Sequence, residues 1–136
     1  MPTFTINGPP VPFARAGANG KRRFTPPKQK AAMTAIRYVA KPHFPKPMEG
    51  AIRLTVVATF ALPASASRAE KARRLASGHT QKPDADNIGK LVKDALNDVA
   101  YYDDAQVSEL IVRKVWGHAA QTQVTVEPCP APPAVP

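Results

Sequence analysis

The residues best suited to chemistry in this sequence are the aspartates between Lys82 and Val107, in KPDADNIGKLVKDALNDVAYYDDAQV. Asp84 and Asp86 lie two positions apart just after Pro83, where extended backbone would point both carboxylates the same way. Like charges held that close repel each other and resist ionisation unless a cation offsets the field. Since hard cations prefer oxygen ligands, a divalent ion such as Mg²⁺ is expected beside this pair.

A second acidic pair, Asp103 and Asp104, follows the first after two tyrosines. A returning strand would bring it beside Asp84 and Asp86, so that three or four carboxylates converge on one site. A divalent ion held there could polarise a phosphodiester and lower the pKa of an attacking water. Lys90, one helical turn after Asp86, would neutralise charge developing on the phosphate or orient the water.

Each of these aspartates also has a structural interpretation. Asp86 could be the N-cap of a helix, with Asp84 shaping the turn before it. Asp94 fits a surface residue or salt-bridge partner better than a metal ligand. Asp103 and Asp104 could form an ordinary polar turn. The histidines are scattered with no pair at ligand spacing, which argues against zinc.

The element that must position these groups is a helix expected to begin at about Asn87. Its apolar residues recur at three- and four-residue steps, which is typical of a helix with one buried face. The buried face would carry Ile88, Leu91, Val92, Ala95, Leu96 and Val99, and the opposite face Asp86, Lys90, Lys93, Asp94 and Asn97.

Apolar periodicity predicts the other elements in the same way. Alternation around Phe4 and Ile6 predicts a short strand, and the residues from 11 to 27 form a loop interrupted by glycine and proline. Further along the chain, a helix is expected over 27–41 and the strongest strand over 51–62. A capping box of Ser67 and Glu70 is expected to open a short basic helix or ordered loop over 65–79. The last expected elements are a strand with a bulge over 107–116 and a strand over 122–126.

This order of elements predicts an α+β (mixed α/β) fold, in which two main helices accompany a mixed β-sheet. The length suits one compact domain, expected over residues 1–127. Residues 128–136 (PCPAPPAVP) are rich in proline and poor in apolar bulk, so they are expected to form a disordered tail.

The charge of the chain indicates a polyanionic partner. Nineteen lysines and arginines against ten acids give a net charge of +9. Nucleic acid is the first candidate and an anionic membrane surface the second, while a ribosomal-type basic protein is a further alternative. The candidate phosphate-binding residues are Arg15, Lys21, Arg22, Arg23, Arg73 and Arg74, although the first four could equally belong to a solvated basic loop.

The cysteine content and hydropathy bear on the compartment. Cys129 is the only cysteine, so no intramolecular disulfide can form, and a reducing cytoplasm fits. No apolar run approaches the roughly 20 residues needed to span a bilayer, and no export signal is visible at the N-terminus. A cytoplasmic protein without membrane association is expected.

The acidic stretch as a whole resembles the signature of the RusA family of Holliday junction resolvases. The resemblance combines the Asp-x-Asp-Asn motif, a lysine four residues after its second aspartate, an Asp-Ala-Leu-Asn helix end and the Asp-Asp-x-Gln-Val cluster. The Gly8-Pro9-Pro10 strand end, the basic loop with Arg15 and the Phe24–Pro27 entry to a helix also look like phage and prophage members. The resemblance to the family covers roughly residues 3–127.

This resemblance implies that Asp84, Asp86 and Asp104 bind Mg²⁺, with Mn²⁺ able to substitute, and that Lys90 is the catalytic lysine. It also implies a homodimer that cuts four-way DNA junctions by paired nicks. Two equivalent strands require two sites, which two-fold symmetry would supply. The basic insert at 65–81 and the tail depart from the family pattern. A less selective Mg²⁺ nuclease on branched replication intermediates, or a non-catalytic DNA-binding accessory, are the alternatives.

Overall fold

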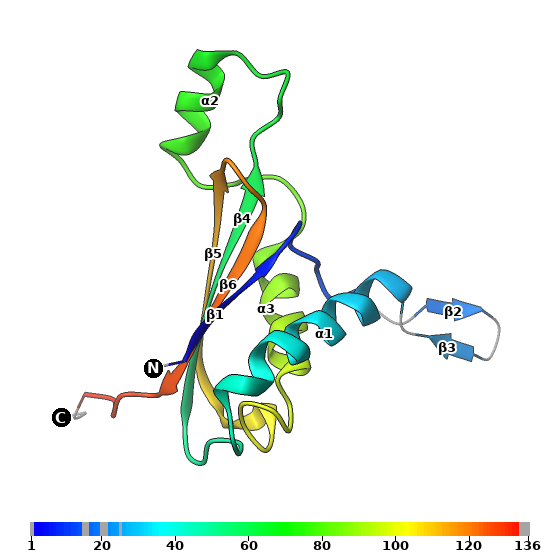
Figure 1. The fold of residues 1–136 in the computed structure, drawn as a ribbon, viewed down its shortest axis with the longest axis vertical. Helices are drawn as coiled ribbons and strands as arrows, with labels where there is room; N and C mark the ends of the chain where they lie inside the picture. Colours follow the sequence, from blue (N-terminus) through cyan, green and yellow to red (C-terminus); the bar gives the residue numbers. More distant parts are fainter. Residues whose placement is uncertain (1, 15–16, 20–21, 25, 134–136) are drawn as a thin grey trace.

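The computed structural model describes residues 2–14, 17–19, 22–24 and 26–133, and Figure 1 shows their arrangement. In the β2–β3 segment it describes the backbone only. The elements in chain order are β1 (Thr3–Asn7), β2 (Gly17–Asn19), β3 (Arg22–Phe24), α1 (Pro27–Ala40), the 3₁₀ turn η1 (Lys41–His43), β4 (Ile52–Ala61), α2 (Arg68–Leu75), α3 (Ala85–Ala95), the 3₁₀ turn η2 (Asp104–Gln106), β5 (Val107–Gly117) and β6 (Gln121–Pro128).

The main sheet has four strands in the order β1-β6-β4-β5. β4 and β5 run parallel, while β6 pairs antiparallel with both β4 and β1. Parallel neighbours need a crossover connection, and here the crossover contains α2 and α3. The α+β expectation with a mixed sheet is therefore confirmed, as a single domain with three helices.

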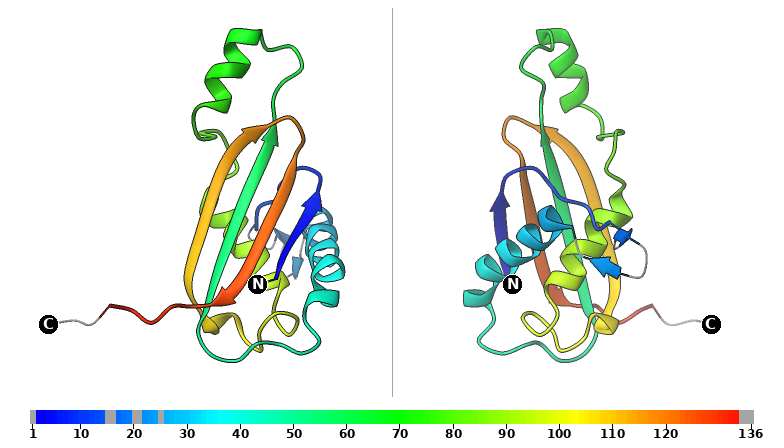
Figure 2. Two further views of the ribbon diagram at one scale, coloured as in Figure 1. Left: turned by 60° about the vertical axis from the view of Figure 1, so that its left-hand side comes forward. Right: turned by 90° about the vertical axis from the view of Figure 1, so that its right-hand side faces the viewer.

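α1 and α3 cover one face of the sheet, and no described helix covers the opposite face (Figure 2). The sequence of β4 explains which face the helices cover, because its alternate residues Ile52, Leu54, Val56 and Ala58 are apolar and buried on that face. α3 contributes Ile88, Leu91, Val92 and Ala95 to the same core. The apolar face expected for this helix is thus confirmed.

Gly89 allows α3 to lie unusually close to β5. A Cβ atom at this position would come within 2.7 Å of Val112 Cγ2 and 3.0 Å of Leu110 Cδ2. Contacts that short require the neighbours to shift, so the absence of a side chain sets the distance between helix and strand. The polar face of α3 is consequently held at a fixed distance from the sheet.

Several boundaries differ from the sequence-based expectations. α3 begins at Ala85, two residues before Asn87, because the chain leaves the extended conformation at Asp84. The interval from 11 to 27, expected to be a loop, contains the antiparallel pair β2–β3. The bulge expected in β5 is confirmed, since the pairing with β4 skips Ser108.

The C-terminal segment is attached to the sheet further than expected. β6 extends to Pro128, and the Cys129 amide donates to the Ala51 carbonyl at 2.8 Å. The first two residues of the expected disordered tail therefore continue the pairing of β6 with the β4 side of the sheet. Disorder beyond them stays a prediction.

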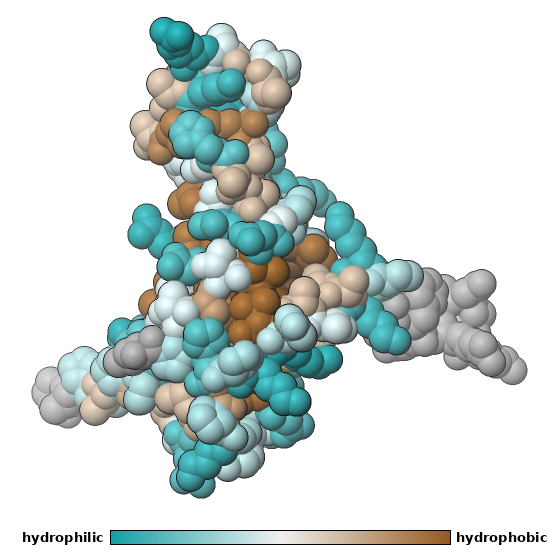
Figure 3. Space-filling model, viewed as in Figure 1, coloured by the Kyte–Doolittle hydropathy of each residue, from teal (hydrophilic) through white to brown (hydrophobic). Residues whose placement is uncertain are grey.

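An apolar hollow of about 310 Å³ lies between the end of β1, α1 and α3. Figure 3 shows apolar side chains gathered at the centre of this face. Ile6, Val11, Ala32 and Leu91 are among its walls, and no carboxylate lines it. The hollow is therefore not a candidate for the chemistry expected of the aspartates. Within the described ranges, no helix has the length and apolar character needed to cross a bilayer.

Candidate active site

The first two candidate acids lie at the N-terminus of α3. Asp84 is the N-cap, with extended backbone, and its side chain makes no capping hydrogen bond. Asp86 lies in the first helical turn, so the expected extended pairing of the two carboxylates is wrong. Both side chains are exposed. Asp86 is therefore not the N-cap, and the Asp84 carboxylate is left available to bind a ligand.

A polar cleft of about 420 Å³ opens beside Asp84. Lys28, at the start of α1, and Lys82 contribute its positive charge, and Phe13 and Asn87 line it further. The Phe13 amide donates to the Asn87 carbonyl at 2.8 Å, which holds the segment before β2 across the first turn of α3. One carboxylate among cations gives a surface able to accept a phosphate beside an acid.

Lys90 lies one turn further along the same helix. Its Nζ atom is 3.5 Å from Asp94 Oδ2 and 4.5 Å from the centroid of the Phe13 ring. The side chain is about half exposed, at 49%. A cation over an aromatic face and beside a carboxylate is oriented but still open to solvent. Lys90 therefore contacts Asp94 rather than Asp84 or Asp86 in this arrangement.

Asp104 lies at the opposite end of α3, next to Asp94. Each of the two carboxyl groups shifts the pKa of the other, and Asn97 Nδ2 donates to Asp104 Oδ2 at 3.3 Å. Asp103 instead caps the η2 turn through the Ala105 amide at 3.0 Å. The polar-turn interpretation therefore holds for Asp103, and Asp104 is the acid that faces the helix.

The contact between Asp94 and Asp104 separates their acidities. Burial raises the pKa of the Asp94 carboxyl above its usual value, the hydrogen bond with Asp104 adds to this, and Lys90 opposes it. Burial also works to raise the pKa of Asp104, but Asp94, Asn97, Asp103 and the charge of Lys93 together outweigh it and hold that pKa below its usual value. Asp94 is thus the carboxyl that takes up a proton more readily, and Asp104 the more acidic of the two.

The expected convergence of all three acids does not occur within this chain. Ten residues of helix separate Asp84 from Asp94, the neighbour of Asp104, which corresponds to about 15 Å along the axis. Within the described ranges, no three histidine, cysteine, aspartate or glutamate side chains form a group that could hold a metal ion. The oxygen donors suit Mg²⁺, but their separation does not suit one three-carboxylate site. The expectation was wrong because Asp104 lies in the η2 turn before β5 begins at Val107, so the returning strand does not carry it back toward Asp84.

The candidate DNA-binding residues fall in two regions. Arg73 and Arg74 lie in the last turn of α2. Arg22 and Arg23 belong to β3, where only the backbone is described. Arg15 and Lys21 lie outside the described residues.

Sequence reasoning missed several residues of this site. Lys28 carries no pattern of its own, because it reaches the cleft through the packing of α1 against α3, whereas Lys82 lies there as the second residue before Asp84. Asn97 was expected on the polar face of the helix with Asp94 but was not assigned to the site, and it lies just after α3 ends at Ala95. The contact between Asp94 and Asp104 could not be predicted, because it depends on the turn after α3.

Comparison with known proteins identifies the class of protein. Residues 7–127 match the family model described as RusA, endodeoxyribonuclease RusA. This chain therefore belongs to the RusA family of endodeoxyribonucleases, enzymes that hydrolyse DNA. It is also similar to the uncharacterized protein YqaN of Bacillus subtilis (strain 168), with 34% identity over 132 residues that cover 90% of this chain and 93% of YqaN.

Proposed function

We propose that this protein is a Mg²⁺-dependent, structure-selective endonuclease that resolves Holliday junctions by paired symmetric nicks, as a homodimer in the cytoplasm. Membership of the RusA family over residues 7–127 carries the proposal. The net charge of +9 supports DNA as the partner, because binding of a basic surface to DNA phosphates releases condensed counterions and so strengthens binding. DNA recombination and repair are the processes in which such junctions arise.

Four residues of α3 and the turn after it are assigned to catalysis. Asp84 and Asp86 at the helix N-terminus, together with Asp104, are the proposed Mg²⁺ ligands, and Mn²⁺ is expected to substitute. Lys90 lies between these two groups of acids and is the proposed cationic residue at the reacting phosphate. Because Asp104 is well separated from the first pair, its role needs a test of its own.

A cleavage assay on defined DNA tests the activity. A synthetic four-way junction, a flap and a plain duplex of the same sequence are each incubated with Mg²⁺ or with EDTA. Symmetric nicks in the junction alone, only with Mg²⁺, are expected. Equal cutting of the duplex would refute junction selectivity, and strong salt-sensitive binding with no cutting would favour a non-catalytic accessory.

Conservative variants test the assignments. Asp84→Asn, Asp86→Asn and Asp104→Asn are expected to reduce junction cleavage by at least 100-fold, while each still binds the junction in EDTA. Mn²⁺ affinity, followed by electron paramagnetic resonance of the free ion, gives a second measurement independent of cleavage. If Asp104→Asn cut at the wild-type rate and bound Mn²⁺ equally well, Asp104 would not be a ligand.

A further inference from the structure

The α2 helix stands beyond the end of the sheet and buries none of its residues (Figure 1). It is attached through β5, where the Arg74 guanidinium carbon lies 4.5 Å from the centroid of the Trp116 ring. α2 therefore adds no residue to the described core and leaves its side chains accessible. Its sequence is basic, with Arg68, Lys71, Arg73 and Arg74 against the single acid Glu70.

A polar pocket of about 410 Å³ lies between α2, the segment that follows it and β5. α2 contributes its two C-terminal arginines, the next segment contributes hydroxyl, amide and backbone groups, and β5 contributes an aromatic wall. The lining residues are Glu70, Arg73, Arg74, Ser77, Gly78, Thr80, Gln81 and Trp116.

The wall of this pocket is rigid. His79 is only 8% exposed and stacks on Phe60 with ring centroids 3.8 Å apart, while its amide donates to the Lys114 carbonyl at 3.0 Å. Lys114 Nζ donates in turn to the Gln81 carbonyl. The segment around Gly78 to Gln81 is thereby held along the edge of β5. A ligand would meet groups that are already positioned, which lowers the entropy lost on binding.

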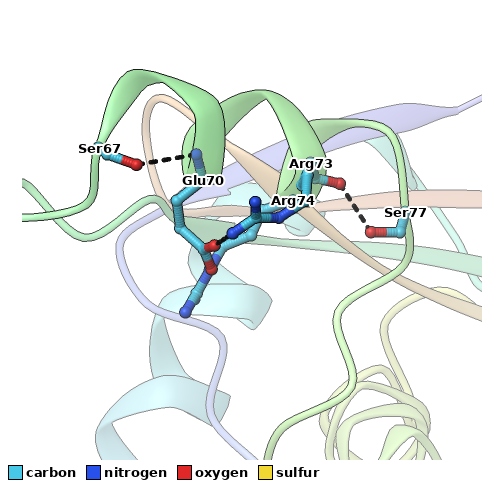
Figure 4. A network of polar contacts seen from close by, with 5 residues as sticks. All are labelled: Ser67, Glu70, Arg73, Arg74 and Ser77. Carbon is cyan, nitrogen blue, oxygen red and sulfur yellow. Dashed lines mark hydrogen bonds and ion pairs between the residues drawn. The ribbon is translucent and has the colours of Figure 1, made fainter.

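The two arginines of the pocket both extend beside Glu70 (Figure 4) but differ in exposure. Arg74 is 24% exposed, bonded to Glu70 at 2.8 Å and stacked on Trp116. Arg73 contacts the same carboxylate but is 72% exposed. One carboxylate facing two guanidinium groups leaves one positive charge uncompensated, and Arg73 retains N–H groups that face solvent.

We propose that this pocket binds a backbone phosphate of the substrate DNA strand, adjacent to the phosphate that is cut. Arg73 supplies the charge-assisted hydrogen bonds, Thr80 and Gln81 supply neutral ones, and Arg74 and Trp116 hold the wall. Gln81 is three residues from Asp84, so the pocket is within about 10 Å of the cleft by chain length. The proposal deepens the proposed function, on which it rests.

The test uses Trp116, the only tryptophan of the chain, as the reporter. A 12-nucleotide single strand and a four-way junction are titrated in EDTA while Trp116 emission is recorded. Wild-type emission should change on binding, and Arg73→Ala should weaken binding at least fivefold. Arg68→Ala is the matched control, because it removes an arginine from the same helix outside the pocket; it should weaken binding less than twofold.

Thr80→Val provides a second variant that leaves α2 untouched. It should weaken binding two- to fivefold without changing the circular dichroism of the protein. Equal effects of Arg73→Ala and Arg68→Ala, or unchanged Trp116 emission on binding, would overturn the pocket and leave only diffuse charge. If the protein cleaves junctions but the Arg73 and Thr80 variants and Trp116 emission show no effect on DNA binding, the pocket alone is refuted. If these measurements show the expected effects but no junction is cleaved, the enzymatic activity alone is refuted.

Discussion

Two carboxyl groups in contact are stable only if one of them keeps its proton or a cation lies between them. At Asp94 and Asp104 the environment separates the two groups, because burial of the 21% exposed Asp94 side chain raises the pKa of that carboxyl, whereas Asp104 accepts from Asn97 and its pKa is lowered. At the residue scale, Asp94 is therefore the more readily protonated of the two and Asp104 the more acidic. Any ligand role belongs to Asp104.

This division predicts how Asp94 tolerates substitution. Asp94→Asn places a neutral donor of the same shape beside Asp104, so it should change the free energy of unfolding by less than about 0.5 kcal/mol. Asp94→Ala leaves Asp104 without this neighbour and should cost about 1 kcal/mol. Urea unfolding of both variants measures the difference. If Asp94→Asn were the more damaging change, Asp94 would carry a charge in the folded protein.

At the scale of elements, periodicity predicted β4, α1 and the apolar face of α3, because each depends on local alternation and burial. It did not predict the helix start at Ala85 or the β2–β3 pair, where local backbone geometry decides. The parallel pairing of β4 with β5 depends on contacts between distant segments, which leave no periodic trace. The placement of Asp104 at the C-terminal end of α3 depends on the turn between α3 and β5, which periodicity does not specify either.

The close approach of α3 to β5 predicts an unusual effect of alanine at Gly89. Alanine favours a helix over glycine by about 1 kcal/mol, but the new Cβ would lie 2.7 Å from Val112 Cγ2. Overpacking of this kind costs about 1–3 kcal/mol, so Gly89→Ala should lower the unfolding free energy by about 1 kcal/mol. Gly78→Ala, whose Cβ would meet its nearest neighbour at 3.7 Å, is the control and should have little effect. Thermal unfolding would contradict the packing argument if Gly89→Ala were the more stable variant.

The packing of His79 against Phe60 and Trp116 predicts a dependence of stability on pH. Burial lowers the pKa of His79 below its usual value, and the charges of Lys114 and Arg74 lower it further. The unfolded chain binds the proton first, so this contribution is complete above about pH 6.5 and is lost as the pH falls through the lower folded value.

Urea unfolding at pH 7.5, 6.5 and 5.5 measures this effect. The wild type should lose stability as the pH falls, whereas His79→Gln should start lower, since stacking on Phe60 is weakened, and vary less. Equal slopes for the two proteins would show that His79 titrates as an exposed histidine does.

At the scale of the whole molecule, each chain offers one set of candidate acids, all of them on α3 and the turn after it. A four-way junction has two strands of equal standing to cut. A two-fold dimer supplies the second set of acids without any new residue, because the same side chains recur around the axis. For the proposed junction-resolving dimer, the number of strands cut is therefore expected to equal the number of competent chains.

Mixed dimers test this relation. Wild-type chains and Asp104→Asn chains carrying different affinity tags are co-expressed, and assemblies with both tags are isolated. On a four-way junction in a supercoiled plasmid, the mixed dimer should leave one nick, whereas the wild-type dimer cuts both strands and releases a linear product. A dimer of two Asp104→Asn chains should neither nick nor linearise the plasmid. A linear product from mixed dimers at the wild-type yield would mean that one chain cuts both strands, and the failure to recover any doubly tagged assembly would refute the dimer itself.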